Sequence, residues 1–136
     1  MITERGWRTA AVVLSAVALS GCSSLSPDGA TADDAAVAFH DALSSSDSAQ
    51  ACDLLAEGTR RELEQSADTP CDDAILEEGL PTADQVVEVA AYGRNARVIL
   101  DGDIEFLTVE GGEWKVIAAG CEFQPNAPYD CSLKGS

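Results

Sequence analysis

The sequence has few of the residues from which catalytic and metal sites are usually built. His40 is its one histidine, and no Cys-x-x-Cys pair occurs, so the familiar zinc patterns are missing. No Gly-x-Ser-x-Gly motif marks a nucleophile elbow. Gly111-Gly112 lies between predicted strands rather than before a helix, where a phosphate-binding loop is found. We therefore expect no catalytic residue, no metal site and no cofactor.

Basic residues are also scarce. The chain has 8 Lys and Arg against 24 Asp and Glu, which gives a formal net charge of −16 at pH 7. Such a surface repels the phosphates of nucleic acids and the anionic headgroups of lipids. We expect no nucleic-acid partner. The charge is explained first by solubility, and the alternative is an acidic patch that recruits a cation or an exported or membrane protein with a basic surface.

Long apolar runs are missing as well. The run from Thr9 to Leu19 is shorter than the roughly 20 residues that a membrane-spanning helix needs. Arg5 and Arg8 precede it, and small residues follow it. A basic start, a short apolar stretch and small residues are typical of a secretory signal peptide.

The end of this segment resembles a known processing site. Leu19-Ser20-Gly21-Cys22 resembles the lipobox of bacterial lipoproteins. The resemblance implies that residues 1–21 are removed and that Cys22 carries a diacylglyceryl group and acyl chains such as palmitate. Two acyl chains suffice for stable attachment to a bilayer. We therefore expect a lipid anchor at Cys22, a Ser/Gly/Pro-rich tether over 22–32, and a location on the extracytoplasmic face of a Gram-positive cell membrane.

The remaining cysteines are even in number: Cys52, Cys71, Cys121 and Cys131. In an exported chain this indicates two disulfide bonds, because the compartment is oxidising. Three connectivities are open to four cysteines. We favour Cys52–Cys71 and Cys121–Cys131, since each pair brackets a probable turn.

The hydrophobic period changes from helical to alternating after Pro81. It predicts helices over 33–45, over 47–65 with a possible break at Gly58, and from Pro70 to Gly79. It then predicts four strands joined by short turns, over 85–92, 96–101, 104–110 and 114–119, and short turns favour an antiparallel meander. Ile99, Leu107, Val109 and Ile117 are placed on the outer, mixed face of this sheet. The prediction is one α+β domain over 33–136, with N-terminal helices packed on a four-stranded sheet.

Two segments of this domain resemble a known superfamily. They are the helix Ala38-Phe39-x-x-Ala42-Leu43 and the hairpin strand Gly112-Glu113-Trp114-Lys115-Val116. Both resemble elements of small exported NTF2-like, cystatin-like proteins, and the resemblance implies a curved sheet that wraps around the helices.

A few polar residues remain as candidates for a site. His40 falls at the edge of its helix's apolar face and is expected at the surface or boundary. Asp101-x-Asp103-x-Glu105 looks like half of a calcium loop, but it lacks the required glycine at the sixth position and an acid at the twelfth, so exposed acids in a hairpin turn explain it better. If the fold contains a pocket, His40 and Tyr92 are its polar candidates.

Three functions fit these observations. The first is a membrane-anchored lipoprotein whose domain binds an exported or membrane protein without catalysis. The second is a carrier or sensor of a small apolar ligand, and the third, favoured least, is an enzyme. A pocket of a few hundred Å³ is the observation that favours a ligand over a flat interface.

Overall fold

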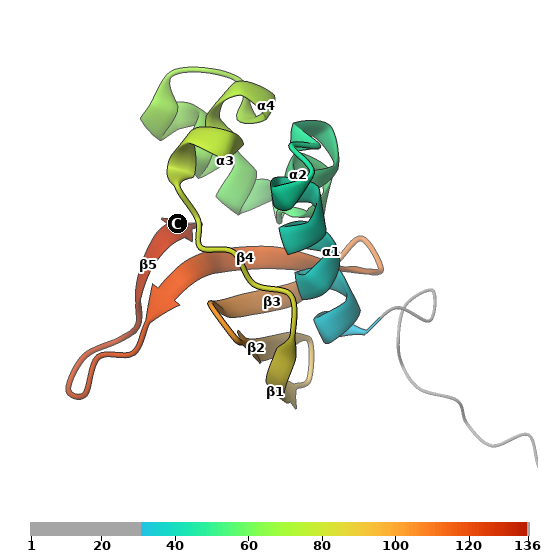
Figure 1. Ribbon diagram of the computed structural model, residues 1–136, viewed down its shortest axis with the longest axis vertical. Helices are drawn as coiled ribbons and strands as arrows, with labels where there is room; N and C mark the ends of the chain where they lie inside the picture. The colour runs from blue at the N-terminus through green and yellow to red at the C-terminus, as the bar shows by residue number, and fades with distance from the viewer. Residues whose placement is uncertain (1–30, 136) are drawn as a thin grey trace, which may run out of the picture.

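The computed structural model describes residues 31–135, in which helices precede an antiparallel sheet (Figure 1). The helices are α1 (Ala32–Ser44), α2 (Ser48–Leu54), α3 (Glu57–Ala67), α4 (Cys71–Ala74) and the 3₁₀ turn η2 (Ile75–Glu78). The strands are β1 (Val86–Tyr92), β2 (Asn95–Leu100), β3 (Ile104–Glu110), β4 (Glu113–Glu122) and β5 (Asp130–Lys134), paired in sequence order. The α+β meander is confirmed. The predicted signal peptide and Cys22 lie outside the described residues.

The start of α1 is fixed by a capping box. The Thr31 hydroxyl accepts from the backbone N–H of Asp34 at 3.4 Å, and the Asp34 carboxylate accepts from the backbone N–H of Thr31 at 3.1 Å. From this cap the apolar face of α1 turns toward the sheet, and Ala36 and Phe39 are fully buried. α1 therefore begins at Ala32, one residue before the predicted start.

The second predicted helix is two helices, and the break is not at Gly58. The chain becomes extended at Leu55 and Ala56, both buried, and Leu55 forms a parallel bridge with Val116 of β4. The Ala56 N–H donates to the Val116 carbonyl at 2.9 Å. Docking of this extended dipeptide on the sheet explains the break, and it is a long-range contact that helical periodicity does not reveal.

The sheet has five strands rather than the predicted four. β5 lies after Pro125 and Pro128, in a stretch for which no strand was predicted, and it pairs with β4. It is only 5 residues long, and Leu133 is its one buried residue. So short a strand with a single inward apolar side chain gives almost no alternating signal.

Both favoured disulfides are present in the structure. Cys52–Cys71 joins α2 to α4, with 6.1 Å between the Cα atoms. Cys121–Cys131 joins directly opposed residues of β4 and β5 and closes the hairpin that extends away from the helices in Figure 1.

The faces of the sheet differ in part from the prediction. Leu107 lies opposite Ala96 on one side and Val116 on the other, and all three are buried beneath the helices. Val109 lies opposite Trp114 and shares that inner face. The prediction that Leu107 and Val109 face outward is wrong, because the pairing of β3 with its neighbours sets the face.

No helix within residues 31–135 is both long enough and apolar enough to cross a bilayer.

Candidate functional site

Three ionisable side chains meet in the interior between α1 and the sheet. His40 comes from α1, Asp103 from the turn before β3, and Glu105 from β3 itself. The His40 Nε2 atom lies 3.2 Å from Oδ2 of Asp103 and 2.9 Å from Oε1 of Glu105. The three residues are 3%, 6% and 0% exposed. We refer to them as the buried cluster.

This arrangement overturns two expectations. His40 is not at the surface, and of the three acids in Asp101-x-Asp103-x-Glu105 only Asp101 is exposed. Glu105 alternates in step with Leu107 and lies opposite Val98, so it shares their buried face. The alternation of the strand contains this information: residues two apart share a face, so if Leu107 points inward, Glu105 does too.

The backbone holds Asp103 in place. Its Oδ1 accepts from the N–H of Ile104 at 2.7 Å and of Cys121 at 3.3 Å, and its Oδ2 accepts from the N–H of Gly120 at 3.1 Å. Gly120, one of these three donors, has a positive φ of 63°, a conformation that glycine adopts readily. The carboxylate therefore has a fixed position and keeps one oxygen toward His40.

The protonation of His40 and Glu105 departs from that of free side chains. Burial lowers the pKa of His40, but contact with Asp103 and Glu105 outweighs burial and raises it to about 9. Burial raises the pKa of Glu105 to about 7, although His40 opposes the shift. The imidazole is thus held as a cation against at least one carboxylate.

Hydrogen bonding inside the cluster is incomplete. Among the described side chains, Nε2 of His40 and both carboxylate oxygens of Glu105 are buried and make no aligned hydrogen bond. Buried polar atoms without partners are uncommon in native structures, and each one calls for an explanation.

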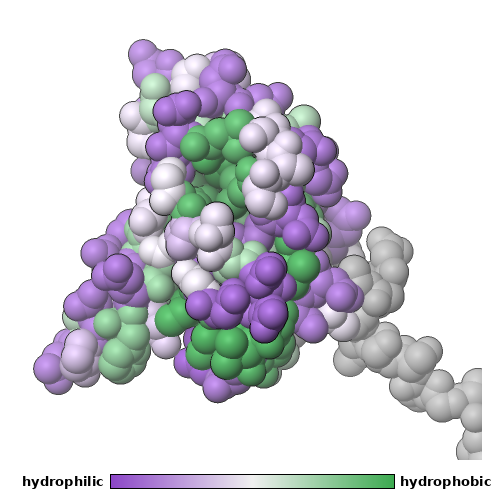
Figure 2. Space-filling view, viewed as in Figure 1, coloured by the Kyte–Doolittle hydropathy of each residue, from purple (hydrophilic) through white to green (hydrophobic). Residues whose placement is uncertain are grey.

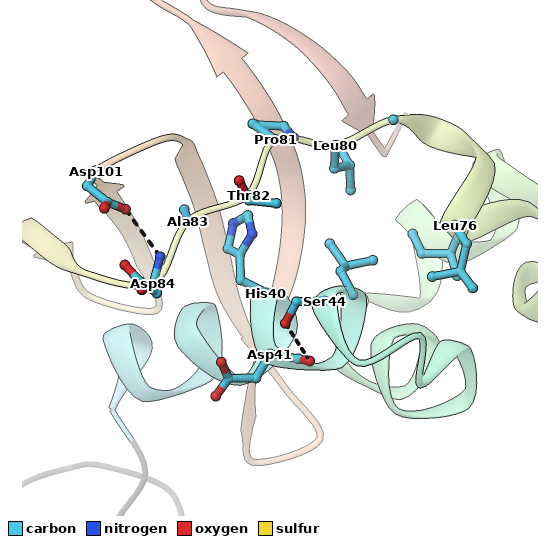
Figure 3. A pocket seen from close by; sticks show the side chains of 13 residues that line it. His40, Asp41, Ser44, Leu76, Leu80, Pro81, Thr82, Ala83, Asp84 and Asp101 are labelled. Atoms are coloured by element: carbon cyan, nitrogen blue, oxygen red, sulfur yellow. Dashed lines mark hydrogen bonds between the residues drawn. The ribbon is translucent and has the colours of Figure 1, made fainter.

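A half-open groove lies next to the cluster, with His40 in its wall (Figure 3). Its volume is about 550 Å³, and it runs between α1, η2 and the extended segment 79–84. Figure 2 shows apolar atoms exposed in a hollow on this face. The apolar lining residues are Leu43, Ile75, Leu76, Leu80, Pro81 and Ala83, and the polar ones are His40, Asp41, Ser44, Thr82, Asp84 and Asp101.

A close backbone approach positions one wall of the groove. A Cβ atom at Gly102 would lie 2.3 Å from the carbonyl oxygen of Thr82, so only glycine fits there. Beside it, Asp101 Oδ1 accepts from the backbone N–H groups of Asp84 and Gln85 at 3.2 and 3.4 Å. These hydrogen bonds lower the pKa of Asp101, which keeps a negative charge at the rim.

The structure separates the two predicted pocket residues. His40 lines the groove, and its ring extends from α1 toward the Pro81–Ala83 stretch in Figure 3. Tyr92, at the end of β1, is 64% exposed and is not part of the groove. The sequence therefore identified one groove residue, His40. It did not predict that Asp103 and Glu105 join His40 in the buried cluster.

Comparison of the chain with protein-family models, with curated proteins and with solved structures gave no match.

Proposed function

We propose that this chain is a membrane-anchored extracytoplasmic lipoprotein whose domain binds, without catalysis, a segment of an exported or membrane protein. The main support for this proposal is the groove beside the buried cluster. It offers an apolar floor, a half-open shape and an acidic rim in one place. The segment it fits best has apolar side chains interspersed with lysine or arginine.

Charge supports that choice of occupant. Asp41, Asp84 and Asp101 line the groove, and among residues 31–135 no lysine or arginine does. In Figure 3 the Asp41 carboxylate points away from the His40 ring, so it is free to meet a cation from outside. The net charge of −16 would further steer a basic partner toward the domain.

The volume of the groove supports a second candidate function. A volume of about 550 Å³ falls within the range of small-molecule sites, which favours a carrier or sensor of a small ligand as the second candidate. An open groove edged with carboxylates is less suited to a purely apolar ligand, which would leave those carboxylates poorly hydrated.

The proposal also includes the cellular location and the fold family. The lipobox-like Leu19-Ser20-Gly21-Cys22 supports a lipid anchor at Cys22, and two disulfides outside that cysteine fit an oxidising compartment. Helices packed on one face of an antiparallel meander support membership of the NTF2-like, cystatin-like folds.

A matched pair of variants tests the groove. The probe is a fluorescent peptide that alternates leucine and lysine, titrated against the full chain in detergent and followed by anisotropy. Asp41→Asn with Asp84→Asn should weaken binding roughly three- to tenfold, because two rim charges are lost. Asp53→Asn with Asp130→Asn removes the same charge from exposed sites outside the groove and should leave binding nearly unchanged. Equal weakening by both pairs would show non-specific attraction and refute the groove.

A second pair of variants tests whether the apolar lining of the groove contributes to peptide binding. Leu76, 41% exposed in the groove, and Val87, 67% exposed on β1, are each replaced by aspartate. We expect Leu76→Asp alone to weaken binding of the peptide. If a small apolar dye binds in the groove and the peptide does not, the carrier or sensor function replaces the protein-binding function.

The anchor is tested separately. Cys22→Ala should release the protein from the membrane fraction into the medium, because the lipid attachment is lost. Retention of this variant in the membrane would contradict a lipid anchor at Cys22.

A further inference from the structure

We propose that His40, Asp103 and Glu105 form a binding site for a divalent first-row transition metal, best matched by Zn²⁺. The observation behind it is the geometry of the buried cluster. One ligand atom from each of the three residues lies within 4.8 Å of the others, and the two distances from His40 Nε2 are 2.9 and 3.2 Å. Nothing in the groove proposal depends on this site, although the two share His40.

The spacing suits ligands of one ion. Zn²⁺ binds imidazole nitrogen and carboxylate oxygen at about 2.0–2.2 Å, so neighbouring ligand atoms around it lie roughly 3–3.5 Å apart. The His40 distances are at or just below that range. A small movement of the Glu105 side chain would place all three atoms around one centre.

The unpartnered atoms are the second, independent observation. Nε2 of His40 and both oxygens of Glu105 are buried without an aligned hydrogen bond, and Glu105 is fully buried. These atoms belong to two of the three proposed ligands, and one ligand atom of each of the three lies within 4.8 Å of the others. A metal ion would satisfy all of them at once, whereas a proton on Nε2 leaves the second Glu105 oxygen without a partner.

Charge leads to the same conclusion. A metal ion that replaces the proton on His40 leaves a neutral imidazole and two carboxylates, and the −2 charge of that set is cancelled by a divalent cation. One histidine with two carboxylates is a nitrogen and oxygen donor set that suits zinc or manganese rather than a soft thiolate metal.

The surroundings provide support and access. The N–H groups of Ile104, Gly120 and Cys121 orient the Asp103 carboxylate, as outer hydrogen bonds orient the ligands of known metal sites. Of the three proposed ligands, only His40 also lines the groove, so an ion would enter from that side.

The test uses the full chain in detergent, stripped with a chelator and then titrated with Zn²⁺ alone by calorimetry. We expect one ion per chain, and X-ray absorption should show nitrogen and oxygen ligands without sulfur. Glu105→Gln keeps the shape of the side chain and should weaken Zn²⁺ binding by about 100-fold or more, since loss of an outer partner alone typically costs 10–100-fold.

The controls separate this site from the acidic surface. Asp53→Asn with Asp130→Asn should leave the affinity for Zn²⁺ unchanged, because both residues are exposed and distant in sequence from the cluster. Zn²⁺ should raise the melting temperature of the unmodified chain and not that of Glu105→Gln or His40→Gln. Absence of one-to-one binding in the unmodified chain overturns the proposal even if the variants do not fold. Equal binding in Glu105→Gln overturns it as well.

Discussion

The two faces of the sheet carry similar ion pairs in opposite surroundings. On the inner face His40 lies 2.9 Å from Glu105, and both side chains are almost completely buried. On the outer face Arg97 of β2 lies 2.6 Å from Glu88 of β1, with side chains 26% and 55% exposed. The distances are alike, so burial is the main difference between the two pairs.

That difference separates the pairs energetically. Water around Arg97 and Glu88 competes with their attraction and hydrates either residue when its partner is removed. His40 and Glu105 are only 3% and 0% exposed, so removal of one leaves the other in a medium that disfavours its charge. Stability should therefore depend strongly on the inner pair and weakly on the outer one, and three measurements test this.

The largest effect is expected for His40→Ala. This change leaves Asp103 and Glu105 facing each other without a cation, and losing one partner of a buried pair typically costs about 3–5 kcal/mol. Urea unfolding of the chelator-treated chain, followed by circular dichroism, measures it. A loss below about 1 kcal/mol would mean that water enters the cluster and that the two faces do not differ.

An intermediate loss of stability is expected on removal of the Cys121–Cys131 disulfide, which connects the two faces of the sheet. Cys121 donates its N–H to Asp103 on the inner side, and its disulfide closes the hairpin that carries Tyr129 on the outer side. Cys121→Ser with Cys131→Ser should cost roughly 2–4 kcal/mol on the chain-entropy account. The measurement is urea unfolding, with reduction of the unmodified chain as a comparison. No loss of stability in the double variant would show that strand pairing alone holds the hairpin.

The smallest effect is expected for Arg97→Ala. Exposed ion pairs often contribute nothing measurable, so the melting temperature should stay within error of the unmodified chain. Raising the salt concentration should change the stability difference between Arg97→Ala and the unmodified chain little, because the ion pair contributes little at any salt concentration. A drop comparable to that of His40→Ala would contradict the role assigned to burial.

Local signals predicted much of this fold. The change of period after Pro81 and the short turns between strands are readable within a few residues. The missed features depend on long-range contacts. The helix break at Ala56 needs Val116, 60 positions away, and the inward face of Leu107 needs its neighbours on β2 and β4.

The buried cluster shows the same limit. His40 was singled out because it is the only histidine, but its partners are more than sixty residues away in the sequence. Asp103 and Glu105 were seen as a motif and judged exposed, because acids near a glycine-containing turn usually are. Their burial followed only from the register of β3 and the position of α1 above it.

The order of the disulfides bears on how the chain reaches its native state. Within the described residues the first cysteine is joined to the second and the third to the fourth, at separations of 19 and 10 residues. A chain that emerges N-terminus first presents Cys52 and Cys71 before Cys121 and Cys131, and oxidation in order of appearance yields the native pairs. We therefore expect the reduced domain to regain both native disulfides with a thiol oxidant alone, without an isomerase to exchange wrongly joined sulfurs.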